Sequence, residues 1–170
     1  GKLSNLDELD MADTNFTGTI PTEIMSITSL TSLMLGGSYI TRPFPDGFFK
    51  LTNLQHLEIL TLALRGEIPS ELRFLTNLEY LRLEANLEGD LPSGILNLPK
   101  LHSVWISSNP YLRINTADIF WPNKTNWKNI TIEMTEAYGS IPPSVGTLTD
   151  LRELVFLQTT SIRGIIPSEI

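Results

Sequence analysis

The sequence predicts an α/β repeat solenoid in which about seven units of 23–26 residues stack side by side. Three observations predict it. Apolar residues recur with the spacing L-x-x-L-x-L, six of seven units carry an apolar residue followed by Pro, and five of them place a Gly two residues before that pair. The units begin near residues 6, 30, 54, 78, 101, 127 and 151.

The segment 78–92, LEYLRLEANLEGDLP, shows how one unit is built. Leu81 and Leu83 alternate with polar residues, which is typical of a strand with one apolar face. Gly89 lets the backbone turn, and Pro92 ends strand pairing and redirects the chain. After the Pro of most units, apolar residues three apart predict a short helical turn on the convex side, of the 3₁₀ type rather than a long α-helix. One unit cannot bury its apolar face alone, so stacking is expected to give a single parallel sheet with a concave outer surface.

The composition narrows the function classes. The net charge of −7 argues against binding to a phosphate backbone, so no nucleic-acid partner is expected. No apolar run approaches the length of a membrane span, so a membrane would be reached only through segments outside this chain. There is no Cys, which excludes a disulfide framework and a thiolate metal site. We expect residues 1–170 to form a single repeat domain that is an interior slice of a longer array, since both ends fall within repeats.

The full pattern is LxxLxLxxNxLxGxIPxxLxxLxx, and it runs from Leu6 to Ile170. It resembles the plant-specific subtype of leucine-rich repeat found in receptor-like kinases, receptor-like proteins and polygalacturonase-inhibiting proteins. The resemblance implies a right-handed curved solenoid that binds other molecules. The family's ladder Asn is kept only at Asn86 and Asn109; the other units place Thr14, Ser38, Leu62, Thr135 and Thr159 there. Thr and Ser can still hydrogen-bond to backbone, whereas Leu62 cannot, so the ladder should be interrupted at that unit.

Unit five departs most from the pattern. Residues 109–127 lack the Gly-x-Ile-Pro element and carry Phe120 and Trp121 close to Trp127. We interpret this stretch as a bulged loop on the convex side. A repacked repeat without a role of its own is the alternative.

No catalytic constellation is evident. His56 and His102 fall in different units and at different strand positions, and no phosphate loop, metal-spaced His cluster or nucleophile elbow is present. The chain is therefore predicted not to be an enzyme, with no catalytic residues, no cofactor and no metal site. Unit one gathers acidic residues, which read as a solvated face or as a calcium candidate without supporting loop geometry: Asp7, Glu8, Asp10 and Asp13.

The predicted strands define a grid of outward residues about 4.8 Å apart from unit to unit. Its central column is Asp10, Met34, Glu58, Arg82, Trp105, Thr131 and Val155. The seven candidate ligand-binding residues of the concave face are His56, Glu58, Tyr80, Arg82, Glu84, Trp105 and Ser107. Arg, Trp and Tyr are enriched at interface hot spots. Arg82 can pair with Glu58 and stack on Trp105, either to receive a ligand or as an internal ladder. Outward apolar residues add a partner-like surface: Met34, Leu60, Met134, Val155 and Leu157.

Three N-x-[ST] sequons begin at Asn15, Asn123 and Asn129. With the repeat subtype they favour a secretory route and an extracellular or cell-surface location. A glycan on Asn129 would block part of the concave face. The leading hypothesis is a non-enzymatic recognition module that binds a protein, peptide or glycan, as in an extracellular receptor. The alternatives are an inhibitor of a secreted cell-wall-degrading hydrolase and a structural or adhesive spacer. An ice-binding role would need a uniform Thr or Asn column, and these columns are mixed.

Overall fold

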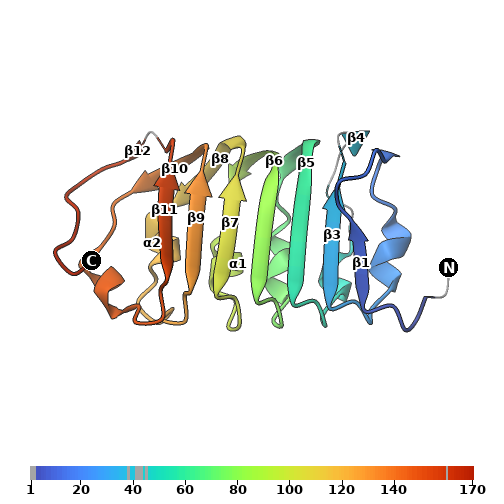
Figure 1. Cartoon of the computed structure of the whole chain (residues 1–170), viewed down its shortest axis with the longest axis horizontal. Coiled ribbons are helices and arrows are strands. Elements are labelled where there is room, and N and C mark those ends of the chain that lie inside the picture. The colour runs from blue at the N-terminus through green and yellow to red at the C-terminus, as the bar shows by residue number, and fades with distance from the viewer. Residues whose placement is uncertain (1–2, 38, 41–43, 45, 160) are drawn as a thin grey trace.

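Seven parallel strands lie side by side in one open sheet, in chain order, as Figure 1 shows. The computed structural model describes residues 3–37, 39–40, 44, 46–159 and 161–170. The seven strands are β1 (Glu8–Met11), β3 (Ser32–Gly36), β5 (His56–Glu67), β6 (Tyr80–Asp90), β7 (Ser103–Ser107), β9 (Asn129–Glu133) and β11 (Glu153–Leu157). One strand arises from each predicted unit, so the repeat solenoid is confirmed.

The strand register matches the predicted grid. Along the central column, Asp10 pairs with Met34, Met34 with Glu58, and Glu58 with Arg82. The column continues through Trp105 to Thr131 and Val155. Because side chains alternate along a strand, the residues one position to either side point inward. The outward side chains of the seven strands are called the concave face below.

The inward side chains form the core between the sheet and the convex turns. Leu57, Ile59, Leu81 and Leu83 have no exposed surface. Short helical segments lie behind the sheet in Figure 1: η1 (Thr22–Ser26), η2 (Phe48–Lys50), η3 (Ser70–Phe74), η4 (Pro143–Thr147) and α1 (Ser93–Leu96). All but α1 are 3₁₀ helices, as the sequence predicts. None of the described helices is long and apolar enough to cross a membrane.

Additional strands extend the sheet beyond the prediction. Strand β8 (Asn109–Asn115) pairs with the end of β6, and β10 (Thr135–Gly139) pairs with β8 and with β12 (Ser161–Ile162). Strands β2 (Thr17–Gly18) and β4 (Tyr39–Ile40) form a separate pair. The repeat glycines have a positive φ, for example 106° at Gly139. A Cβ there would lie 2.3 Å from Oγ1 of Thr116, so the tight turn requires glycine.

The prediction that unit five forms a bulged loop is wrong. Residues 109–115 form β8, whose Leu112 and Ile114 are buried, and α2 (Thr116–Ile119) follows. The side chain of Asn115 caps α2 by accepting from the backbone N–H of Ala117 at 3.0 Å. Phe120 and Trp127 enter the core, and Trp121 alone remains exposed. Apolar burial has replaced the missing Gly-x-Ile-Pro turn, so this unit is a repacked repeat.

The ladder position behaves differently from unit to unit. Asn109 is fully buried; its amide donates to the carbonyls of Leu83 and Ser107 and accepts from the backbone of Leu87. Thr14 donates to the carbonyl of Gly36 at 3.3 Å.

At Leu62 the ladder is interrupted, as expected: the side chain is 57% exposed, and the register between β5 and β6 shifts between Thr61 and Arg65. Asn86 instead donates to the carbonyl of Leu62. Thr135 departs from the prediction, because its buried hydroxyl has no hydrogen-bond partner. Ser38 lies outside the described residues.

Candidate ligand-binding face

The centre of the concave face joins four predicted residues into one cluster. The guanidinium of Arg82, on β6, lies 3.7 Å from a carboxylate oxygen of Glu58 on β5 and 3.0 Å from one of Glu84 on its own strand. Its Cζ lies 4.7 Å from the ring centroid of Trp105 on β7. A cation held over an indole face and between two carboxylates is fixed in position by three neighbours.

A second stack adjoins this cluster. The rings of His56 and Tyr80 are parallel within 10°, with centroids 4.3 Å apart. His56 Nε2 lies 2.8 Å from Oε1 of Glu58, which therefore receives both His56 and Arg82. Burial raises the pKa of the Tyr80 phenol, and the nearby carboxylate of Glu58 raises it further, while Arg82 opposes the rise. Tyr80 thus stays protonated and able to donate a hydrogen bond.

The cluster remains open to solvent. The side chain of Glu58 is 13% exposed and that of Arg82 29%, and Trp105 is 36% exposed. The Nε of Arg82 is buried without a hydrogen-bond partner. Ser107, the seventh predicted residue, is almost completely buried, so it forms the floor beside Trp105 rather than a contact surface.

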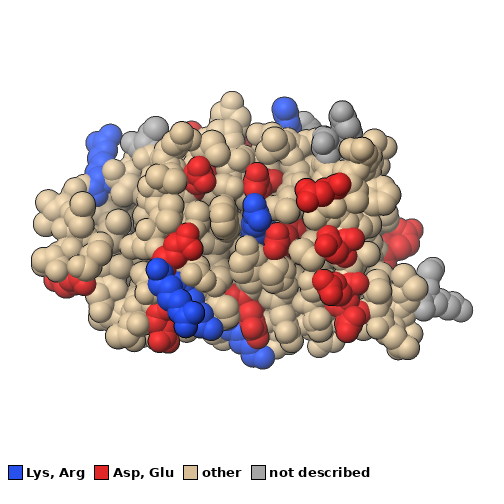
Figure 2. All heavy atoms as spheres, in the orientation of Figure 1, with Lys and Arg blue, Asp and Glu red and all other residues tan. Residues whose placement is uncertain are grey.

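Charge is unevenly spread over this face. Figure 2 shows acidic side chains gathered over the N-terminal strands and a basic group between acidic ones over the middle of the sheet. The carboxylates of unit one, Asp7, Glu8, Asp10 and Asp13, are all exposed. Among the described residues, no group of three or more His, Asp or Glu side chains is placed to hold a metal ion.

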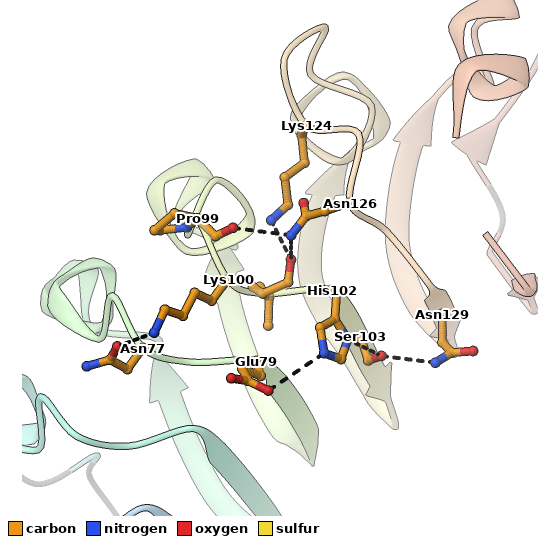
Figure 3. Close-up of polar contacts among 10 residues, drawn as sticks. Asn77, Glu79, Pro99, Lys100, His102, Ser103, Lys124, Asn126 and Asn129 are labelled. Atoms are coloured by element: carbon orange, nitrogen blue, oxygen red, sulfur yellow. Dashed lines mark hydrogen bonds and ion pairs between the residues drawn. The ribbon is translucent and has the colours of Figure 1, made fainter. Parts of the chain in front are cut away.

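The sequence did not predict a polar network at the start of the strands, which Figure 3 shows. Asn129 donates to the hydroxyl of Ser103 at 2.9 Å, and that hydroxyl lies 2.9 Å from Nδ1 of His102. His102 Nε2 lies 3.9 Å from Glu79. Burial lowers the pKa of His102, and the positive charge of Lys128 lowers it further. The network links three consecutive repeats edge to edge.

Lys124 is the second unpredicted feature. It is 6% exposed, and its ammonium donates to the carbonyl of Leu98 at 2.6 Å and to that of Leu101. It also lies 4.8 Å from the ring centroid of Trp127. Burial lowers its pKa to about 8. Asn126 adds a bond to the same Leu101 carbonyl at 3.3 Å, so the loop fastens unit five to unit four.

The three sequons occupy different environments. Asn15 and Asn123 are exposed, and the structure leaves room for a glycan at either. Asn129 lies on the concave face, half-buried, with its amide bonded to Ser103. Whether any of them carries a glycan stays a prediction.

The geometry first defines a class: short parallel strands stacked in register, each followed by a turn and a convex helical segment, form a repeat solenoid with one open sheet face. The first repeat, residues 5–27, matches the family model described as Leucine Rich Repeat. The chain thus has the fold of a leucine-rich-repeat solenoid. The matched family is a repeat family rather than an enzyme family. No curated protein matches the sequence.

Solved structures with this fold include two plant receptors. The chain is 26% identical to the ectodomain of the receptor kinase GASSHO1/SCHENGEN3 from Arabidopsis thaliana, with a TM-score of 0.79; the match covers 98% of this chain and 20% of that one. It is 28% identical to the plant peptide hormone receptor RGFR1, with a TM-score of 0.82, over 99% of this chain and 27% of that one. A plant ice-binding protein, at 22% identity and a TM-score of 0.69 over 98% of this chain and 68% of that one, shares the fold. The chain thus spans about a quarter or less of the length of the two receptors.

Proposed function

We propose that this chain is a recognition module that binds a protein or peptide through its concave face, as the extracellular part of a surface receptor does. The observation that carries the proposal is the cluster of Glu58, Arg82 and Trp105, held in place at the centre of an open sheet face. Arg and Trp are the side chains that most often dominate binding energy when they lie near the centre of an interface.

The cluster is preorganised for binding. Each large side chain is already fixed by a neighbour: Arg82 by two carboxylates and an indole ring, and Tyr80 by the ring of His56. Ordering a long side chain on binding costs about 0.5–1.5 kcal/mol, so a face whose anchors are fixed beforehand avoids much of that cost.

The structural relatives support a peptide or protein partner. The GASSHO1/SCHENGEN3 ectodomain was solved in complex with CASPARIAN STRIP INTEGRITY FACTOR 2, and RGFR1 in complex with RGF2. Both are plant receptors, which supports an extracellular location and a signalling role for this chain. Its place as one slice of a longer array, and a glycan as the ligand, stay predictions.

Peptide display on the immobilised protein tests the proposal. Peptides selected on the parent should bind the double variant R82A/W105A at least about tenfold more weakly, since loss of one hot-spot residue alone costs about 2 kcal/mol. The matched control is R73A/F74A, which removes another cation–aromatic pair, 4.8 Å apart, from the convex helix η3. Selected peptides that bind R82A/W105A as tightly as the parent would sink the proposal.

A further inference from the structure

We propose that the N-terminal half of the concave face binds an extended, cationic peptide segment rich in Lys or Arg; this rests on the proposed function and names its ligand chemistry. The first observation is the charge of the outward positions. Six of them carry a carboxylate: Glu8, Asp10, Glu58, Glu84, Glu133 and Glu153. Arg82 is the one Lys or Arg at the predicted grid positions of the seven strands.

The single outward cation is already engaged. Arg82 contacts Glu58, Glu84 and Trp105, so it offers little to an incoming anion. By contrast, Glu8 and Asp10 have no basic partner among the described residues, and both are exposed. A cationic side chain therefore meets unpaired carboxylates on β1, whereas an anionic ligand meets repulsion.

The residues just before the seven strands show where the acidic part of the concave face ends. Backbone hydrogen bonds of 2.7–3.0 Å link the second residue of all seven units into one row: Asp7, Thr31, Gln55, Glu79, His102, Lys128 and Arg152. The row is acidic or neutral through unit four and basic in the last two units. In units one to four this row adds to the field of the outward carboxylates, whereas in units six and seven Lys128 and Arg152 oppose the field of Glu133 and Glu153.

Apolar side chains lie between these carboxylates. Met34 pairs in register with Asp10 on one side and Glu58 on the other, and Leu60 pairs with Glu84. Both apolar side chains are partly exposed. The surface therefore suits a segment that carries apolar residues between its basic ones.

The spacing of the strands sets the spacing of the basic residues. Asp10 and Glu58 are two strands apart, which is about 9–10 Å. In a polyproline II segment, which rises about 3.1 Å per residue with three residues per turn, side chains three positions apart lie on the same side and about 9 Å apart. The inferred occupant crosses the strands with Lys or Arg at every third position.

Fluorescent decapeptide pools test this ligand chemistry. One pool carries Lys at positions 2, 5 and 8, Leu at 4 and 7 and random uncharged residues elsewhere; matched pools carry Gln or Glu in place of Lys. Fluorescence anisotropy at low salt should show the Lys pool binding at least about tenfold more tightly than the Gln pool, with the Glu pool weakest. Raising the salt to about 0.3 M should weaken the Lys pool, because exposed charges are then screened.

Two variants locate the binding. The change E8Q/D10N removes two carboxylates from the concave face and should weaken the Lys pool by about fivefold or more. The control E23Q/E71Q removes two exposed carboxylates from η1 and η3 on the convex side and should leave binding unchanged. Equal weakening by both pairs would show only attraction to net charge and would overturn the inference.

The other outcomes separate this inference from the proposed function. If the Gln or Glu pool binds most tightly and R82A/W105A abolishes that binding, the recognition function stands and the cationic ligand is wrong. If E8Q/D10N weakens binding of the Lys pool but R82A/W105A does not, the cationic ligand is supported and the role of Arg82 and Trp105 as central anchors is wrong. If no pool binds with a Kd below about 1 mM, both are overturned.

Discussion

Two cations in this molecule each lie over a tryptophan ring, yet they differ in solvent exposure and in the groups that they contact. Arg82 is 4.7 Å from the ring of Trp105 on the open concave face, and Lys124 is 4.8 Å from the ring of Trp127 inside the solenoid. Arg82 is paired with carboxylates and partly exposed, whereas Lys124 is buried and bonded to backbone carbonyls. The same contact therefore lies on an open surface in one place and fastens two repeats in the other. Solvent access and the partner type, rather than the cation–aromatic contact itself, decide between these roles.

The largest difference between the two sites should be in stability. The change K124A removes a buried stem packed on Trp127 and two donors to carbonyls, and we expect a loss of about 3–4 kcal/mol in the free energy of unfolding. Urea denaturation followed by circular dichroism measures it. The control K100A removes an exposed lysine that donates to Asn77 at 2.8 Å, and it should cost less than about 1 kcal/mol. Equal losses in the two variants would contradict the structural role of Lys124.

The second difference is in pH dependence. The pKa of Lys124 is lowered to about 8 by burial, against an ordinary value of 10.5. Between these values the unfolded chain binds more protons than the folded one, so stability rises with pH across this window and is flat below it with respect to this group. The full gap corresponds to about 3 kcal/mol, so a rise of about 2–3 kcal/mol is expected.

The variant K124M isolates this contribution, because it keeps the apolar stem and removes the titrating group. The difference in unfolding free energy between parent and K124M should grow in favour of the parent from pH 8 to pH 10.5. The titrations of other groups cancel in the difference. A difference that stays constant with pH would show that Lys124 has its ordinary pKa.

The two sites also differ in how far the sequence predicts them. The position of Arg82 beside Glu58 and Trp105 follows from two regularities: alternation along a strand and a fixed offset between repeats. These hold wherever the unit length is regular. They give the register of the central column correctly, but they do not show that Ser107 is buried or what binds to the face.

The sequence does not predict the position of Lys124, because both regularities fail after strand β7 in unit five. Without a Gly-x-Ile-Pro element, the sequence does not show where β8 ends or which residues return to the core. A lysine is also expected at the surface unless it is paired. One signal was available: Thr-Asn precedes the apolar residue that opens units three, four and six, and each Asn donates to a carbonyl of the preceding repeat, as Asn53, Asn77 and Asn126 show. The Thr-Asn pair therefore indicates that Asn126, two residues after Lys124, contacts the backbone of the preceding repeat.

The smallest expected effect is the coupling between Arg82 and Trp105. A double-mutant cycle of R82A, W105A and R82A/W105A, measured by urea denaturation, should give a coupling of about 0.5–1 kcal/mol, as for cation–π pairs at exposed sites. Raising the salt should change it little, because the indole carries no net charge. The matched cycle for the convex pair Arg73 and Phe74, whose contact distance is 4.8 Å, should give a similar or smaller value.

A coupling above about 2 kcal/mol at the concave pair would mean that Arg82 holds the repeats together as Lys124 does. The contrast between the two cations would then be one of degree. A coupling near zero in the free protein, with a large loss of peptide binding in R82A/W105A, would sharpen the contrast instead. In that case the Arg82–Trp105 contact would contribute almost nothing to the free energy of unfolding. It would contribute to binding only, when a ligand covers it and excludes water.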